Sequence, residues 1–136
     1  MFSQLQNPFA LLSRVSLAAL FLPAGLAKLT GFDATVAYIT AVGLPAPTLA
    51  AAAALVLEIG GGIALILGVG TRFAALALAL FTLIASVVFH AYWAAPADQA
   101  FVTQLLFFKN IGVAGGLLAI AAFGAGRWSL DARRVN

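Results

Sequence analysis

The stretch 55–67 reads LVLEIGGGIALIL and places a single acid, Glu58, in the middle of an apolar run. An ionisable side chain at the centre of a membrane helix costs at least about 2.5 kcal/mol on insertion scales, so it normally faces partners or a cavity inside the protein. At helical spacing Gly61 and Gly62 share the face of Glu58, and such small residues let a second helix approach closely. The stretch therefore predicts a polar site within a bundle of helices.

The composition places this stretch in an integral membrane protein. Apolar residues make up 64% of the 136 residues, charged residues only 8%, and the mean hydropathy is +1.11, whereas soluble domains carry about a quarter of charged residues. Because a span needs roughly 20 residues, the chain has room for four spans with short connections but not for a separate soluble domain. We expect an all-α, polytopic four-helix bundle that forms one membrane domain over residues 1–136.

Charge and cysteine content exclude several classes of function. The formal net charge of +3 comes from scattered Arg and Lys, without the basic cluster interleaved with aromatics that is typical of nucleic-acid binding. Since there is no cysteine, the chain forms no disulfide, carries no redox pair and offers no thiolate to a metal. His90 is the single histidine, and with one acid in mid-span it makes no metal-binding set. We expect a lipid bilayer around the protein, and neither a nucleic-acid partner nor a metal.

Hydrophobic runs, punctuated by proline and glycine, define four expected spans at about residues 8–29, 48–67, 72–93 and 101–123. Asn7 and Pro8 have the pattern of a helix cap followed by proline at the first helical position. Residues 33–42 predict a short interfacial helix between the first two spans, with an ordered loop as the alternative. The apolar side of this segment either rests on the membrane surface or covers the mouth of the bundle.

Basic residues gather at one end of the expected bundle. Four arginines lie at the end that holds both termini: Arg72, Arg127, Arg133 and Arg134. The opposite end has Lys28 with two acids, so the positive-inside rule predicts both termini in the cytoplasm. In addition, GVGTR at 68–72 is echoed by GAGR at 124–127, which suggests a parallel repeat of two helix pairs.

The polar residues of the spans fall at depths where several of them can meet. Counting about 1.5 Å per residue, Glu58 lies near mid-membrane, while Lys109 and Arg14 lie about 12 and 9 Å from the ends of their spans. These depths predict a charged cluster of Arg14, Glu58, Lys109 and Asn110, provided that the first, second and fourth spans adjoin. Lys28 and His90 lie nearer the surface and would form the mouth of the site.

Each of these groups also has a purely structural interpretation. Glu58 with a basic partner is either the centre of a ligand or proton site or half of an ion pair that fixes helix register. Lys28 either lines the mouth or extends its ammonium group to the interface. For His90 the two interpretations have equal weight: a functional group at the mouth, or a hydrogen-bonded interfacial histidine.

A series of short motifs runs through nearly the whole chain: Arg14, FLPAGLAK at 21–28, Tyr38, GLP at 43–45, Glu58 with its glycines, LILG at 65–68, Thr71 and Arg72, FH at 89–90 with Trp93, FKN at 108–110, GG at 115–116 and WSLD at 128–131. In this order they resemble the DoxX family of small bacterial membrane proteins. The resemblance implies a four-helix protein of the bacterial inner membrane. The family takes its name from a subunit of a thiosulfate:quinone oxidoreductase, and the wider group includes cargo receptors and chaperones.

Two functions of different classes follow. In the first, a quinone or similar lipid-soluble molecule binds with its head at Glu58, Lys109 and Asn110. Arg14 tunes the acid, Lys28 lines the mouth, and Glu58 and His90 are the candidate catalytic residues that move protons. The chain would then be the membrane subunit of a quinone-linked oxidoreductase with a redox protein partner. In the second, it is a non-catalytic membrane subunit or assembly partner, whose ion pair is structural and whose glycine faces serve association, including with a second copy. The sequence leaves enzymatic activity open.

Overall fold

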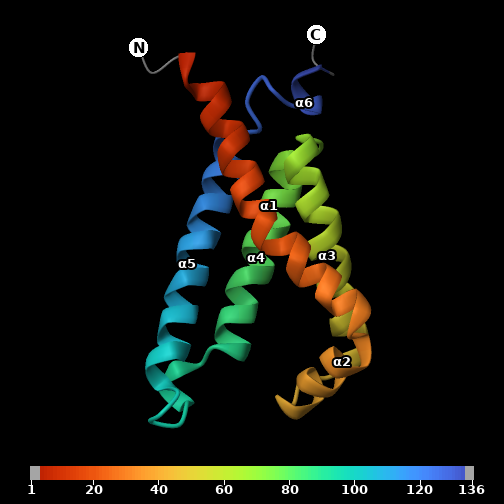
Figure 1. Ribbon diagram of the computed structural model, residues 1–136, viewed down its shortest axis with the longest axis vertical. Coiled ribbons are helices and arrows are strands. Elements are labelled where there is room, and N and C mark those ends of the chain that lie inside the picture. Colours follow the sequence, from red (N-terminus) through yellow and green to blue (C-terminus); the bar gives the residue numbers. More distant parts are fainter. Residues whose placement is uncertain (1–3, 134–136) are drawn as a thin grey trace.

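The computed structural model describes residues 4–133, which form helices joined by short connections (Figure 1). In chain order the elements are α1 (Gln6–Thr30), α2 (Phe32–Ala41), α3 (Pro47–Leu67), α4 (Thr71–Phe89), the 3-10 turn η2 (Tyr92–Ala94), α5 (Ala100–Phe123) and α6 (Leu130–Arg133). In this part of the chain no strand occurs, and four segments are long and apolar enough to cross a membrane: α1, α3, α4 with η2, and α5. The expected all-α fold with four spans is confirmed.

The third span departs most from its expected bounds. It was expected as one helix over residues 72–93, but α4 ends at Phe89 and η2 follows after two non-helical residues. The ring of Tyr92 packs against Phe107 and Phe108 of α5, with centroids 5.5 and 6.0 Å apart. These contacts hold η2 against α5, so the chain turns aside before the helix can continue.

The first helix also begins differently from the expected cap. α1 starts at Gln6, and Asn7 lies inside it rather than before it. The side-chain oxygen Oδ1 of Asn7 instead accepts a hydrogen bond of 2.9 Å from the backbone N–H of Arg127. Asn7, which was expected to cap the first helix, therefore links the start of α1 to the segment that follows α5.

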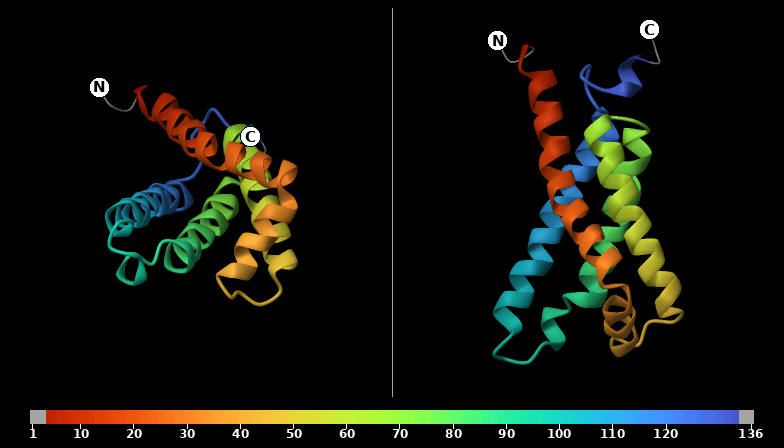
Figure 2. Two further views of the ribbon diagram at one scale, coloured as in Figure 1. Left: turned by 60° about the horizontal axis from the view of Figure 1, so that its bottom comes forward. Right: turned by 45° about the vertical axis from the view of Figure 1, so that its right-hand side comes forward.

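The helices form two limbs that diverge toward one end of the molecule. The first limb consists of α1, α2 and α3, and the second of α4, η2 and α5; within each limb the long helices pack along their length. The limbs meet mainly where α3 turns into α4, and α1 crosses α5 at that same end (Figures 1 and 2). The start of α1 and the short α6 also lie there, whereas α2 and η2 lie at the splayed end (Figure 1).

Glycines on α3 let both neighbouring helices come close, as their position beside Glu58 predicts. A Cβ atom at Gly62 would lie 2.7 Å from the Leu22 side chain of α1, and one at Gly61 would lie 2.8 Å from the Leu78 side chain of α4. Real Cβ atoms essentially never approach other atoms so closely. Any larger residue at these positions would push α3 away from its neighbours.

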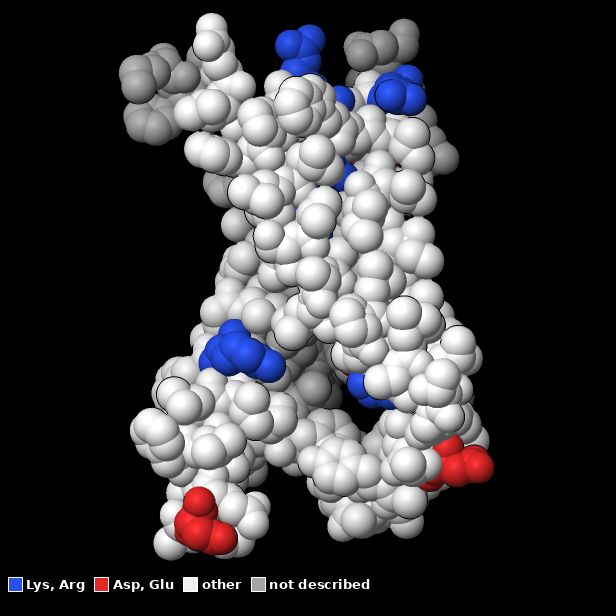
Figure 3. Space-filling model, viewed as in Figure 1, with Lys and Arg blue, Asp and Glu red and all other residues white. Residues whose placement is uncertain are grey.

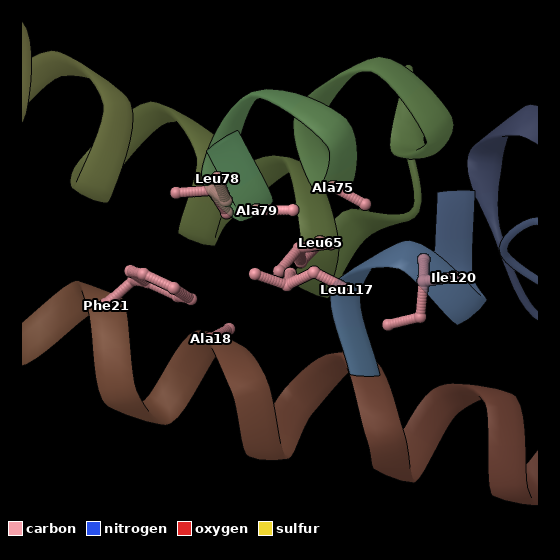
Figure 4. Close-up of a cluster of buried hydrophobic side chains, with 8 residues drawn as sticks. All are labelled: Ala18, Phe21, Leu65, Ala75, Leu78, Ala79, Leu117 and Ile120. Atoms are coloured by element: carbon pink, nitrogen blue, oxygen red, sulfur yellow. The ribbon is translucent and has the colours of Figure 1, made fainter. Parts of the chain in front are cut away.

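The hydrophobic core fills the end where the limbs meet. Side chains from all four spans contribute to it: Ala18 and Phe21 of α1, Leu65 of α3, Ala75, Leu78 and Ala79 of α4, and Leu117 and Ile120 of α5 (Figure 4). All eight are at most 6% exposed. Because this core joins the limbs at one end only, the other end is free to enclose a cleft.

Arg14 is fully buried at the joined end. Its guanidinium group donates hydrogen bonds to the carbonyls of Leu65 (2.8 Å) and Ile66 (3.2 Å) in the last turn of α3, and to the carbonyl of Trp128 in the C-terminal segment. The last carbonyls of a helix have no partner within it and carry partial negative charge, so a cation stabilises them. Arg14 therefore links α1, the end of α3 and the C-terminal segment.

Asp131 completes this arrangement from the C-terminal side. Its carboxylate accepts hydrogen bonds from the backbone N–H groups of Gly70 (2.7 Å) and Thr71 (2.9 Å) at the start of α4. Its own N–H donates to the carbonyl of Gly68 (2.8 Å). A carboxylate is favourable at a helix N-terminus. We call the contacts of Arg14 and Asp131 the clasp, since together they fix the α3–α4 turn.

The echo between the two halves of the sequence has a structural counterpart. In both GVG at 68–70 and GAG at 124–126 each glycine has a positive φ, which disfavours other residues. Arg72 donates to the carbonyls of Ala121 and Ala122 at the end of α5, as Arg14 does at the end of α3. Each limb thus ends in the same way, with an arginine from its first helix bound to the last carbonyls of its last helix.

Candidate functional site

Glu58 forms an ion pair with Lys28 across the α1–α3 contact. The Nζ atom of Lys28 lies 2.9 Å from Oε1 and 2.8 Å from Oε2 of Glu58. The Glu58 side chain is only 6% exposed and that of Lys28 is 27% exposed. Gly25, one turn before Lys28, makes room for this approach, because a Cβ there would lie 3.1 Å from the Cβ of Glu58. The basic partner of the acid is therefore Lys28, which was expected at the mouth or the interface.

Arg14 lies outside this site, contrary to the expected cluster with Glu58. Its hydrogen bonds reach the end of α3, seven and eight residues beyond Glu58, which is roughly 10 to 12 Å along the helix. The reason is the register of the antiparallel pair, in which Leu22 lies against Gly62. This register brings Lys28 to the level of Glu58 and carries Arg14 past it. The depth of Arg14 in the membrane could not reveal that register.

The ion pair forms part of the wall of a cleft of about 820 Å³ between the limbs. Most of the lining is apolar, with many alanines from α1, α2, α3 and α4. Its polar side chains are few: Lys28, Thr35, Tyr38, Glu58, Thr82, His90, Lys109 and Asn110. Figure 3 shows the hollow between the two limbs and a basic side chain at its rim. The arrangement is typical of small-molecule sites, which are mainly apolar and have a few polar groups that orient the ligand.

The second limb contributes the polar groups on the other side of the cleft. Lys109 and Asn110 come from the middle of α5, and His90 is the first residue after α4. α3 and α5 make little contact with each other, so Lys109 lines the same cleft as Glu58 without pairing with it. Within residues 4–133, Lys109 and Asn110 make no side-chain hydrogen bond or ion pair, although Asn110 is only 8% exposed. These donors are available to a ligand.

An aromatic contact joins the limbs at the splayed end. Tyr38 of α2 stacks on Phe89 at the end of α4, with ring centroids 5.4 Å apart and an angle of 22° between the planes. Both residues line the cleft. The sequence predicts a helix with an apolar side here, and covering the mouth was one of its two expected roles. That Phe89 would be the partner was missed, because it depends on where α4 ends.

No group of three or more His, Asp or Glu side chains lies close enough together in residues 4–133 to hold a metal ion. The polar groups of the cleft are ammonium, amide, imidazole and hydroxyl groups and one carboxylate.

Comparisons with known proteins agree on one family. The model of the DoxX family matches residues 9–91. Inner membrane protein YphA of Escherichia coli (strain K12) is 37% identical over 123 residues, which cover 90% of this chain and 88% of that protein. Inner membrane protein YqjF of the same organism is 37% identical over 128 residues, which cover 94% and 93%. No solved structure matches the chain.

Proposed function

The chain belongs to the DoxX family, and on that premise we propose that its cleft binds a lipid-soluble small molecule, with an isoprenoid quinone as the candidate. It would act as the membrane subunit of a quinone-linked redox system. The relatives are named inner membrane proteins, which supports a place for this chain in the same membrane.

The observation that carries this proposal is the pairing of an apolar cleft with two separate polar sets. A cleft of about 820 Å³ lies within the usual range of about 300 to 1,000 Å³ for ligand pockets. The Lys28–Glu58 pair lines it from the first limb, and Lys109, Asn110 and His90 line it from the second. A molecule with an apolar tail and a compact polar head matches this distribution.

The residues present fit a quinone head. The buried amide of Asn110 and the ammonium group of Lys109 have no partner among the described residues, and such donors suit ring carbonyl oxygens. A quinone, when bound, supplies the capacity to accept two electrons and two protons. Glu58 and His90 are the groups that would hold or move protons near it, and Lys28 would keep the Glu58 carboxylate in place.

The test is mass spectrometry of small molecules that copurify with the protein from native membranes. We compare wild type, Glu58→Gln and the control Gly60→Ala, which lies on the same helix where a new Cβ meets nothing within 4 Å. We expect a quinone to be enriched with wild type and with the control, and to fall about tenfold in Glu58→Gln, equivalent to about 1.4 kcal/mol. Equal retention by all three, or no enrichment with wild type, would contradict the proposal.

We also propose that the clasp end of the molecule faces the cytoplasm. Arg127 and Arg133 are exposed there, whereas exposed Asp33 and Asp98 lie near the splayed end. The positive-inside rule places such arginines on the cytoplasmic side. In that orientation the splayed end of the cleft and its Tyr38–Phe89 contact lie toward the outer surface.

A non-catalytic membrane subunit is the second candidate function. It is favoured by the ion pair itself, because Lys28 joins both oxygens of Glu58 and thereby links α1 to α3. In this function the pair would fix the register of α1 against α3, as single buried polar residues do in coiled coils. Recovery of a protein partner in fixed stoichiometry from native membranes, together with unchanged quinone content in Glu58→Gln, would support this function over the first.

A further inference from the structure

We propose that Lys109 is an anion-binding group of the cleft, and that the bound molecule is a single-chain amphiphile whose head carries an oxyanion. This inference rests on the proposed function, since it specifies the ligand of the same cleft. A quinone with an ionised ring hydroxyl and a long-chain carboxylate share this chemistry.

The first support is the balance of charge around the cleft. Glu58 is the only acid among the described residues that line it, and both of its oxygens lie within 3 Å of Lys28. The acid is thus matched by one lysine, and Lys109 remains as a second cation with no acidic partner in residues 4–133. Counted by formal charge, the two lysines outnumber the one acid in the cleft lining.

The second support is the place of this charge in the membrane. Lys109 is the tenth residue of α5, roughly 14 Å along a helix that spans the bilayer. A cation at such depth is costly unless it faces a partner or a water-filled cavity. An oxyanion beside Lys109 would supply that partner, and charge-assisted hydrogen bonds are about twice as strong as neutral ones.

The third support is the neighbourhood of Lys109. Asn110 follows it directly and is buried, its side-chain amide has no hydrogen-bond partner within the described chain, and His90 lines the same cleft. An amide and an imidazole can both donate to an oxyanion. The remaining wall is mainly alanine, leucine and phenylalanine, which suits one hydrocarbon tail. The three donors thus define a head site, and the apolar wall a tail site.

The experiment measures binding to the full chain in nanodiscs of zwitterionic lipid. The probes are a 2-hydroxy-1,4-naphthoquinone with a dodecyl chain, whose hydroxyl is ionised at neutral pH, its uncharged methyl ether, and dodecanoate. The proteins are wild type, Lys109→Gln, Lys109→Arg, and the control Arg127→Gln, which removes an exposed cation from the segment between α5 and α6, at the clasp end of the molecule.

We expect wild type and Arg127→Gln to bind the hydroxyquinone about tenfold more tightly than the ether. Lys109→Gln should bring the two affinities within about twofold by weakening only the anion, and Lys109→Arg should keep the preference. Binding of dodecanoate with the same dependence on Lys109 would show that the oxyanion suffices without the ring.

The outcomes separate this inference from the proposed function. If wild type binds hydroxyquinone and ether equally, the anion site is overturned while quinone binding stands, and this comparison needs no variant to fold. If dodecanoate binds through Lys109 and neither quinone binds, the anion site stands and the quinone proposal fails. If none of the three probes binds, both proposals fail.

Discussion

Replacing Lys28 by methionine would leave the carboxylate of Glu58 without its partner while keeping an unbranched side chain that is one atom shorter. The free-energy cost of leaving one charge unpaired differs between the two residues, because the Glu58 side chain is 6% exposed and that of Lys28 is 27% exposed. Removing one member of a buried pair costs about 3 to 5 kcal/mol. We expect Lys28→Met to lie at the low end of this range, since the cleft beside the pair is open to water or lipid.

The reverse change, Glu58→Met, should cost less, about 1 to 2 kcal/mol, because the partly exposed ammonium group of Lys28 can turn away. The double variant should recover most of the loss, since replacing a buried pair by apolar residues is often neutral. The cycle therefore predicts a coupling energy of about 2 kcal/mol or more.

The assay is equilibrium unfolding by SDS titration in mixed micelles, followed by circular dichroism. Single variants within about 0.5 kcal/mol of wild type, or losses that simply add in the double variant, would refute the reasoning that Lys28 and Glu58 stabilise each other. A double variant that is as stable as wild type but retains no quinone would assign the pair to the ligand site.

Three further outcomes follow from the clasp, the glycine contacts and the charge distribution. Asp131→Asn should lower the free energy of unfolding by about 1 to 2 kcal/mol, because it replaces the carboxylate that accepts hydrogen bonds from the N–H groups of Gly70 and Thr71. Asp98→Asn, at an exposed acid, should change the free energy of unfolding by less than about 0.5 kcal/mol. Equal effects of the two variants in the same SDS titration would be inconsistent with the clasp. Gly62→Val should lower the free energy of unfolding by about 1 to 3 kcal/mol, because the larger side chain forces α1 away from α3. The control Gly60→Ala, where a new Cβ lies in open space, should be neutral or slightly stabilising. If Gly62→Val were as stable as wild type, the helices would not pack this closely. Because the chain has no cysteine, Arg127→Cys and Asp98→Cys can each be labelled alone: a membrane-impermeant thiol reagent should modify only the second in intact cells, and the opposite result would invert the orientation.

Much of the fold could be predicted because apolar length and helical periodicity are local properties. The buried residues of α1, Arg14, Ala18, Phe21 and Gly25, recur at helical spacing along one face. The end of α4 could not be read in the same way, since its run of apolar residues continues to Trp93. It depends on rings of η2 that pack on α5, a contact between segments that periodicity does not encode.

For the candidate site, the sequence predicted which residues lie near one another better than it predicted which of them form a pair. Depth along the spans selected Glu58, Lys109 and Asn110, and all three line one cleft. Depth could not choose between Arg14 and Lys28 as the partner of the acid, because that choice depends on the register of α1 against α3. The spacing of Gly25 and Lys28, one turn apart on one face, was the available signal: the glycine marks where α3 comes closest.

The position of Arg14 bears on how the protein is made. Its acceptors are far away in the chain: Leu65 lies 51 residues later and Trp128 lies 114 residues later. During synthesis the first span therefore enters the membrane with a guanidinium group whose final acceptors do not yet exist. Only when residue 128 has left the ribosome can all three carbonyls be in place. A translation product that stops after α5 would contain every span and still lack the last contact of its first helix, so the closing step of biogenesis belongs to a short segment outside the spans.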